Sequence, residues 1–278
     1  MELLPELILM ATPLMMVSLG ALVSERAGVM AVYADGLINL GAFIFYAVTV
    51  FTNSVFLGVL CSLVICVFIA FISAYLTKTL NANPFLTGLA LNVGVSGIIT
   101  FSSVQIFGTR GVIAFSDFTF TANTQTLLVC IAWFVIILSI LILVFTKIGL
   151  YLKITGSYPE VLIAKGIKPD YWKIFSWCVA GFFSAFAGCL LVISLSSYVP
   201  NISAGCGWTA LAVVFLGRKK IVGVFIAAAI FTVTEYVANN IQNIQFLSNI
   251  PSAWLLALPY TVALILIALD FKHKKQGY

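Results

Sequence analysis

Long apolar runs recur along the whole chain and are separated by short polar or charged segments. A helix needs about 20 apolar residues to cross the hydrocarbon core of a bilayer, and most of these runs are of that order. The pattern predicts nine membrane-spanning helices, within a range of eight to ten. The expected spans are 7–23, two spans between Asp35 and Lys78 on either side of 52–54, 85–107, 127–145, a long span that starts after Lys173 and ends before 196–201, 207–217, 221–238 and 254–269.

Two of these spans are irregular. Pro13 lies inside the first one, where its missing N–H predicts a break in the helix. The seventh, 207–217, is too short for a straight crossing and predicts a broken helix or a re-entrant turn. No linker or soluble segment interrupts the series, so residues 1–278 are expected to form one all-α, polytopic membrane domain.

The composition supports this class. Hydrophobic residues make up 62% of the chain and charged residues 8%, whereas soluble domains carry about 25% charge. So few charges cannot keep a soluble fold dispersed, and the basic residues do not form the patch on a polar surface that binds nucleic acid. The apolar runs are continuous and do not alternate, which argues against a transmembrane barrel.

Signs of an enzyme are missing from the sequence. No G-x-x-x-x-G-K-[ST] phosphate loop occurs, so the chain is not expected to hydrolyse ATP itself. The only histidine is His273 and the six cysteines include no C-x-x-C pair, so no metal site is expected. The cysteines are expected to act as small apolar residues, with free thiols.

The charges divide unevenly between the two sides of the predicted membrane. If the 147–173 loop is cytoplasmic, thirteen basic residues fall on the cytoplasmic side and only Arg110 falls outside. The positive-inside rule then places the N-terminus outside and the C-terminus in the cytoplasm. The outer loops 108–126, with Phe118–Thr121, and 239–251 are either docking surfaces for an outside partner or plain solvated loops.

The 147–173 loop is long enough to contain a short helix of its own. Ser157 is a suitable cap, Pro159 and Glu160 suit a first turn, and Gly166 suits an end. Such a helix would offer Val161, Leu162 and Ala164 to a partner or lie passively on the lipid surface. We favour docking, because the connector is longer than packing requires.

Several polar residues and glycines lie within or beside the apolar spans, where each needs a partner or a water-lined path. For Asn92, helix–helix hydrogen bonding and a path are equally good interpretations, and Glu235 either lines a path or sits in water. The candidates for a translocation path are Asn39, Asn92, Ser96, Trp208 and Glu235. The candidates for gate or structural positions are Glu25, Arg26, Gly28, Gly88, Gly217 and Arg218.

Four segments, in order and spacing, resemble the permeases of ABC importers in the branched-chain amino acid, ribose and nucleoside group. The similarity is greatest to the shorter permease of the nucleoside or simple-sugar subgroup. Residues 25–37 are similar to the segment E-R-S-G-V-V-N-I-G-L-E-G-M of that subgroup, although Ala31 and Tyr33 stand where the subgroup has an Asn and a Gly. Three further segments match motifs of the subgroup: 88–92 matches G-L-A-L-N, 158–167 resembles N-P-E-A-A-x-x-A-G-I, and 207–218 resembles G-W-I-A-L-A-V-V-I-F-G-R. Together the four segments extend the resemblance over roughly residues 10–270.

The resemblance implies a type II ABC importer-like fold and a permease role in the bacterial inner membrane. The cargo would be a nucleoside, a simple sugar or a flavin-like vitamin. Residues 157–168 would be the coupling helix that docks into a cytoplasmic ATPase, which alone would bind ATP and Mg²⁺. A second, longer permease would complete a heterodimer, and an extracytoplasmic protein would deliver the substrate. The alternatives are an ion-coupled secondary transporter, disfavoured because only Glu235 lies deep in a span, and a non-transporting scaffold.

Overall fold

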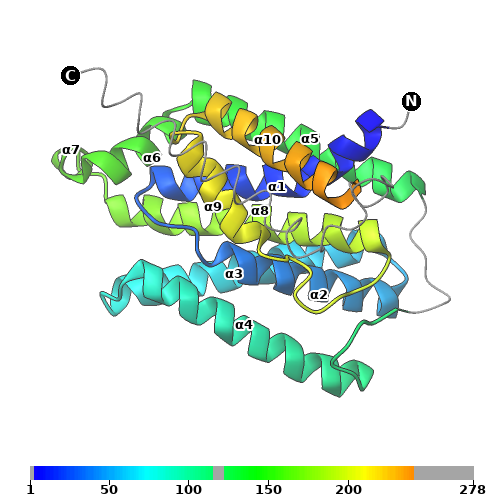
Figure 1. Cartoon of the computed structure of the whole chain (residues 1–278). Coiled ribbons are helices and arrows are strands. Elements are labelled where there is room, and N and C mark those ends of the chain that lie inside the picture. The colour runs from blue at the N-terminus through cyan, green and yellow to red at the C-terminus, as the bar shows by residue number, and fades with distance from the viewer. Residues whose placement is uncertain (1–2, 115–121, 241–278) are drawn as a thin grey trace.

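The computed structural model describes residues 3–114 and 122–240, and within these the chain is built of ten helices (Figure 1). An isolated β-bridge joins Ile113 to Tyr198. The helices are α1 (Leu3–Arg26), α2 (Ala34–Thr52), α3 (Val55–Thr79), α4 (Pro84–Phe107), α5 (Ala122–Phe145), α6 (Lys147–Ser157), α7 (Pro159–Ala164), α8 (Pro169–Leu195), α9 (Cys206–Leu216) and α10 (Ile221–Asn240).

Seven helices of the described chain are long and apolar enough to cross a membrane, namely α1, α2, α3, α4, α5, α8 and α10. The predicted short span is α9, which has 11 residues. The expected ninth span, 254–269, lies outside the described residues, so the count of nine stays a prediction. The break expected at Pro13 is wrong: α1 continues through it. A single missing N–H costs one hydrogen bond, which the packing around this central helix offsets.

The bundle is organised around α8, which packs most extensively on α1, α2 and α3. Glycines let these backbones approach closely, as is common between membrane helices. A Cβ on Gly41 would meet the backbone of Ala185 at 2.7 Å, and one on Gly188 would meet the backbone nitrogen of Ala42 at 2.8 Å. The α2–α8 contact is thus closed by small residues on both helices.

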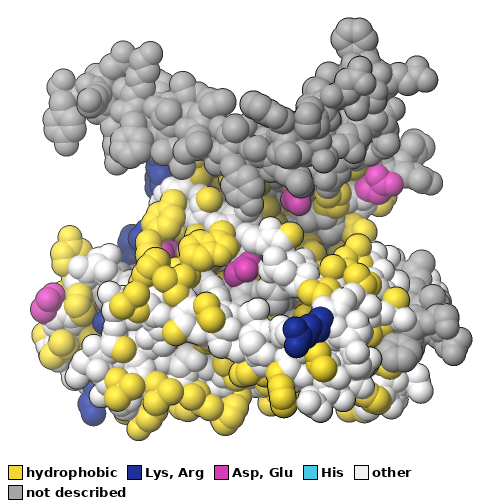
Figure 2. Space-filling view, turned by 60° about the horizontal axis from the view of Figure 1, so that its bottom comes forward, with side chains coloured by type: hydrophobic (Ala, Val, Ile, Leu, Met, Phe, Trp, Pro, Cys, Tyr) yellow, Lys and Arg dark blue, Asp and Glu magenta, His cyan; other side chains and the backbone are white. Residues whose placement is uncertain are grey.

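The outer helices expose apolar side chains. Most residues of the α3, α4 and α5 spans are not buried within the chain, and Figure 2 shows a face on which apolar side chains far outnumber charged ones. In water such a surface would promote aggregation, whereas in a bilayer lipid covers it. α4 lies at the edge of the bundle (Figure 1), where it packs mainly on α2.

Two helices, α2 and α9, begin inside the bundle. The chain after α1 turns back into the protein, where Ala31, Val32 and Tyr33 are fully buried. The Tyr33 ring stacks on Trp177, two turns into α8, with 4.0 Å between ring centroids. Residues 196–205 likewise form an irregular segment before α9. The short helix α9 thus follows a break in the helical run, as expected, and the N-termini of α2 and α9 lie within the described bundle.

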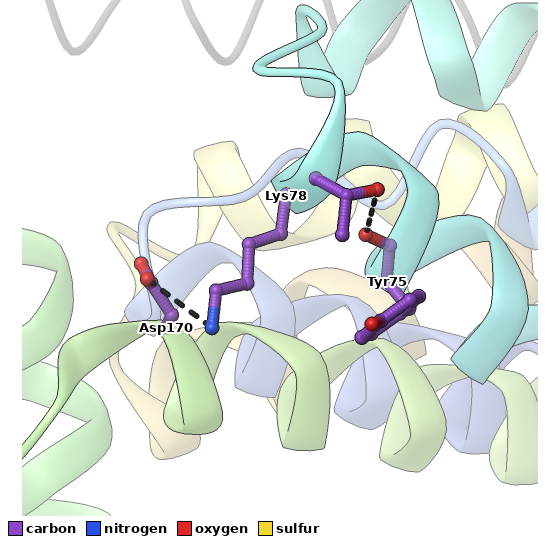
Figure 3. A network of polar contacts seen from close by, with 4 residues as sticks. Tyr75, Lys78 and Asp170 are labelled. Atoms are coloured by element: carbon purple, nitrogen blue, oxygen red, sulfur yellow. Dashed lines mark hydrogen bonds and ion pairs between the residues drawn. The ribbon is translucent and has the colours of Figure 1, made fainter.

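The described basic residues gather at one end of the bundle, here called the basic end. It comprises the end of α1, the end of α3, α6, α7, the start of α8 and the turn between α9 and α10. There Lys78 reaches from α3 to Asp170 at the start of α8, with 3.5 Å between Nζ and Oδ2 (Figure 3). Arg110, which follows α4, lies at the opposite end, as the charge asymmetry predicts.

Candidate functional site

A polar pocket of about 220 Å³ lies where α2 and the segment before α9 face α4. Amide, hydroxyl and carboxylate side chains stand in its wall among a larger apolar surface, and the described lining residues include no basic side chain. The pocket is lined by Asp35, Gly36, Asn39, Asn92, Val95, Ser96, Ile99, Thr100, Tyr198, Pro200 and Asn201.

Asn39 ties the first turns of α2 to the segment before α9. Its amide nitrogen donates to Ser203 Oγ at 2.9 Å, and its amide oxygen accepts from the Ser203 backbone N–H at 3.0 Å. The same nitrogen lies 3.3 Å from Asn201 Oδ1 and 3.1 Å from the Asp35 carbonyl oxygen. Because a buried backbone N–H needs a partner, Asn39 fixes the irregular segment that forms one wall of the pocket.

Asn92 joins α4 to the start of α2. Its amide nitrogen donates to the Val32 carbonyl oxygen, and its amide oxygen accepts from the Gly36 N–H, each at 2.9 Å. The nitrogen and the oxygen of the Asn92 amide thus both bond to backbone groups at the start of α2 that have no partner within the helix. Asn92 has helix–helix partners and also lines the pocket, so both sequence-based interpretations describe it.

The N-termini of α2 and α9 meet beside the pocket. Asp35 Oδ1 accepts a hydrogen bond from the Gly207 N–H at 3.1 Å, so the one carboxylate in the lining is engaged with the start of α9. With a carboxylate and no cation among the described lining residues, the wall disfavours an anionic molecule and offers amide and hydroxyl groups for hydrogen bonding. Helix breaks that surround a central site are common in membrane transporters.

The predicted path residues separate into two groups in the structure. Asn39, Asn92 and Ser96 line the pocket together. Trp208 and Glu235 lie outside its lining. The path candidates chosen from the sequence did not include Asp35, Thr100, Tyr198, Asn201 or Ser203. The signal for Tyr198 and Asn201 was the polar segment 196–201 before an unusually short helix.

Several predicted gate and structural positions form a junction at the basic end. Lys219, in the turn between α9 and α10, pairs with Glu25 at 2.9 Å between Nζ and Oε2. The Arg26 guanidinium donates to the Lys219 carbonyl oxygen at 3.3 Å. The Glu25 side chain is 5% exposed and that of Lys219 48%, and Glu25 Oε1 has no hydrogen-bond partner among the described residues. The junction therefore links the end of α1 to the turn after α9.

The same junction contacts α6. A Cβ on Gly28 would lie 3.1 Å from the Gly156 Cα, and one on Gly156 would meet the Arg26 carbonyl oxygen and lie 2.7 Å from the Gly28 nitrogen. Gly28 also has a φ of +80°, which favours glycine. The other predicted glycines close helix contacts as well: Gly88 packs against Val32 and Tyr33, and Gly217 packs against Val224 beside Arg218.

The expected coupling segment needs two corrections. Ser157 is not a helix cap but the last residue of α6, and α7 begins at Pro159 after Tyr158, which makes no side-chain capping bond. Leu162 is fully buried and is not available to a partner, because the six-residue α7 packs back on α6 and α8. Glu160, Val161 and Ala164 are exposed, and Gly166, with a φ of +73°, follows the helix as expected.

The remaining sequence predictions concern thiols, metals and outer loops. All six cysteines are free, as expected, although Cys130 is exposed on α5. Among the described residues, no cluster of His, Cys, Asp or Glu could hold a metal ion. Phe118–Thr121, His273 and most of the 239–251 loop lie outside the described residues.

Substitutions of Glu25 and Lys219 test whether their ion pair couples the end of α1 to the turn after α9. For the importer that the sequence resemblance implies, we expect Glu25→Gln and Lys219→Gln each to lower uptake by about threefold to tenfold. The double variant should be little worse than either, because both single changes remove the same interaction. Uptake normalised to protein amount in membranes measures the effect. The exposed neighbour Lys220→Gln is the control and should behave like the parent; strictly multiplicative losses in the double variant would contradict the coupling.

Comparison with known proteins assigns the family. A family model described as "Branched-chain amino acid transport system / permease component" matches residues 3–269. The chain belongs to this permease family. The guanosine ABC transporter permease NupQ of Bacillus subtilis is 23% identical over 94% of this chain and 89% of NupQ. The nucleoside ABC transporter permease NupC of Lactococcus lactis subsp. cremoris is 24% identical over 95% of this chain and 90% of NupC.

TsgC13 of Haloferax volcanii, a permease protein whose name points to glucose, is 26% identical over 84% of this chain and 76% of its own length. No solved structure matches the sequence at a significant level. The relatives confirm the resemblance, drawn from four motifs, to ABC importer permeases of the simple-sugar and nucleoside group. With the seven apolar helices of the described residues, the family places this permease in the inner membrane as a multi-pass protein.

Proposed function

We propose that this permease is the transmembrane subunit of an ABC importer and moves an uncharged polar metabolite, a nucleoside or a simple sugar, through the polar pocket. The observation that carries the proposal is a pocket wall in which amide, hydroxyl and carboxylate side chains stand among apolar surface, with no basic side chain among the described lining residues. Phosphorylated cargo would need cationic partners there. The relatives whose names point to guanosine, nucleosides and glucose support the same substrate class.

In this proposal the basic end faces the cytoplasm, as the positive-inside rule requires. The N-terminus is then outside and the C-terminus is cytoplasmic. A separate ATPase subunit, which binds ATP and Mg²⁺, docks on α7. A second permease, a longer paralogue, completes the path, and an extracytoplasmic binding protein delivers the cargo on the opposite side. This chain supplies no ATPase site.

A continuous route connects α7 to the pocket. α7 follows α6 after one residue, and Gly156 of α6 lies against Gly28. From there Glu25 reaches Lys219 at the end of α9, and the start of α9 is bonded to Asp35 in the pocket wall. We assign this route to the transmission of ATPase movement, because each step joins packed or hydrogen-bonded groups.

Purification with the partner subunits tests the function. We expect the chain to co-purify with a P-loop ATPase and, in proteoliposomes with the binding protein, to drive ATP-dependent uptake of radiolabelled guanosine or glucose. A labelled flavin tests the third expected cargo. Uptake abolished by an ionophore while ATP is maintained would favour an ion-coupled transporter, and the lack of any ATPase partner would favour a scaffold.

Variants of α7 test the coupling role. We expect Glu160→Lys to uncouple ATP hydrolysis from uptake by reversing an exposed charge, and Gly166→Pro to do the same because proline cannot adopt a φ of +73°. Uptake should fall by about tenfold or more while the amount in the membrane stays unchanged. The control is Lys147→Gln, exposed at the start of α6. Normal uptake in both α7 variants would count strongly against docking at α7.

A further inference from the structure

A second cavity of about 450 Å³ lies at the basic end, on the other side of the start of α2 from the polar pocket. It is open to the surface beside the Lys78–Asp170 pair (Figure 3), and both residues line it. The cavity is lined by Val29, Ala74, Thr77, Lys78, Asn81, Ala82, Pro84, Asp170, Lys173, Ile174 and Trp177. Here it is called the basic cavity.

α4 runs past both cavities. Pro84, its first residue, lines the basic cavity, and Asn92, Ser96 and Thr100 line the polar pocket. Between these positions Gly88 packs against the chain before α2: a Cβ there would lie 3.3 Å from the Tyr33 nitrogen and 3.4 Å from the Val32 Cβ. The two cavities therefore follow one another along α4, and residues 32–33 lie between them.

Three contacts hold this separation closed. Asn92 bonds to the Val32 carbonyl oxygen and the Gly36 N–H, Gly88 closes the space beside Val32, and Tyr33 stacks on Trp177, itself part of the basic cavity wall. The Tyr33 hydroxyl also lies 3.3 Å from Ser24 Oγ. The start of α2 is thus fixed to α1 and α8, while α4 attaches from the edge of the bundle (Figure 1).

From this arrangement we infer that Val32, Tyr33, Gly88 and Asn92 form the inner gate of the polar pocket. Separation of α4 from α2 would break the two Asn92 hydrogen bonds, open the Gly88 contact and join the pocket to the basic cavity. The described conformation has this gate closed. Asn92 is then a positioning residue that holds the gate as well as a wall of the site. The inference rests on the proposed function, since the gate matters for a substrate that leaves through the basic cavity.

A cysteine pair across the gate tests the movement. Val32→Cys with Gly88→Cys places two Cβ atoms close to the separation of a disulfide, about 3.5–4.5 Å. We expect oxidation of the double variant in the assembled transporter to lower uptake by about tenfold or more, with recovery on reduction. The single variants, treated alike, control for the native thiols. Full uptake with the disulfide formed, as measured by mass spectrometry, would overturn the gate.

A labelling experiment covers the case in which the cysteine pair is poorly tolerated. With Ser96→Cys as a probe in the pocket, we expect a membrane-impermeant thiol reagent on the cytoplasmic side to react at least about fivefold faster when Asn92→Ala is added. Thr87→Ala is the matched control, because Thr87 also lies on α4 but its hydroxyl donates to the Asn83 carbonyl oxygen and not to Val32. Equal rates with and without Asn92→Ala would overturn the inference. Labelling needs no substrate, so it separates failure of the gate from failure of the proposed cargo.

Discussion

Asn39→Leu is expected to reduce uptake by tenfold or more while the protein still inserts in the membrane. The change removes the partner of the buried Ser203 N–H and one of the two partners of the Ser203 hydroxyl. Each buried group left without a partner costs about 1–3 kcal/mol, and 1.4 kcal/mol corresponds to about a factor of ten. The segment before α9 would shift to satisfy these groups, which would remove one wall of the pocket.

Ser96→Ala is the matched control for this variant. Ser96 lines the same pocket, but its side chain makes no hydrogen bond with the described part of the chain. The Ser96→Ala variant should therefore change uptake by no more than about threefold, which is the effect expected from the loss of one weak hydrogen bond to the cargo. Uptake of labelled guanosine and glucose in proteoliposomes, with the amount of inserted protein measured by blotting, compares the two. Equal uptake in Asn39→Leu and the parent would argue that the pocket is not the transport site.

Sequence alone could predict the long helices, since membrane-length apolar runs carry a strong and local signal. It could also select Asn39, Asn92 and Ser96, because an amide or hydroxyl at membrane depth is unusual. The sequence could not show which residues these side chains contact. Asn39 meets Ser203, which lies 164 positions away in the chain, and that contact exists only because α9 begins inside the bundle. Trp208 and Glu235 were selected in the same way, from their places within apolar spans, but they lie outside the pocket lining.

The α6–α7 region shows the same limit at short range. Ser157 and Pro159 carry the residue types of a helix start, yet α6 already occupies 147–157 and ends at Ser157. The start of α6 had a signal, since Thr146 Oγ1 accepts from the Ile148 N–H at 3.2 Å as a cap. No signal in the sequence indicated that Leu162 is buried, because its burial depends on how α7 folds back on α6 and α8. Local propensity therefore located the helices but not the surface that they present.

Gly156→Val is the second variant expected to have a large effect. Its side chain would collide with the Arg26 carbonyl oxygen and the Gly28 nitrogen, which are backbone atoms that cannot rotate away. Overpacking of this kind costs about 1–3 kcal/mol, so α6 would have to move off the turn after α1. Since this contact joins α7 to Glu25 and Lys219, we expect uptake to fall by about tenfold or more while the polar pocket, remote from the change, still binds cargo.

The neighbouring Ser157→Val is the control, because Ser157 is exposed and ends the same helix. Cargo binding to the detergent-purified complex and ATP-driven uptake in proteoliposomes should be measured together for both variants. Loss of uptake with retained binding in Gly156→Val alone would place the defect between α7 and the pocket. Loss of cargo binding as well would mean that the Gly156 contact only supports the fold. Normal uptake would remove Gly156 from the route, because the backbone clash must displace α6, and transport would then not depend on its position.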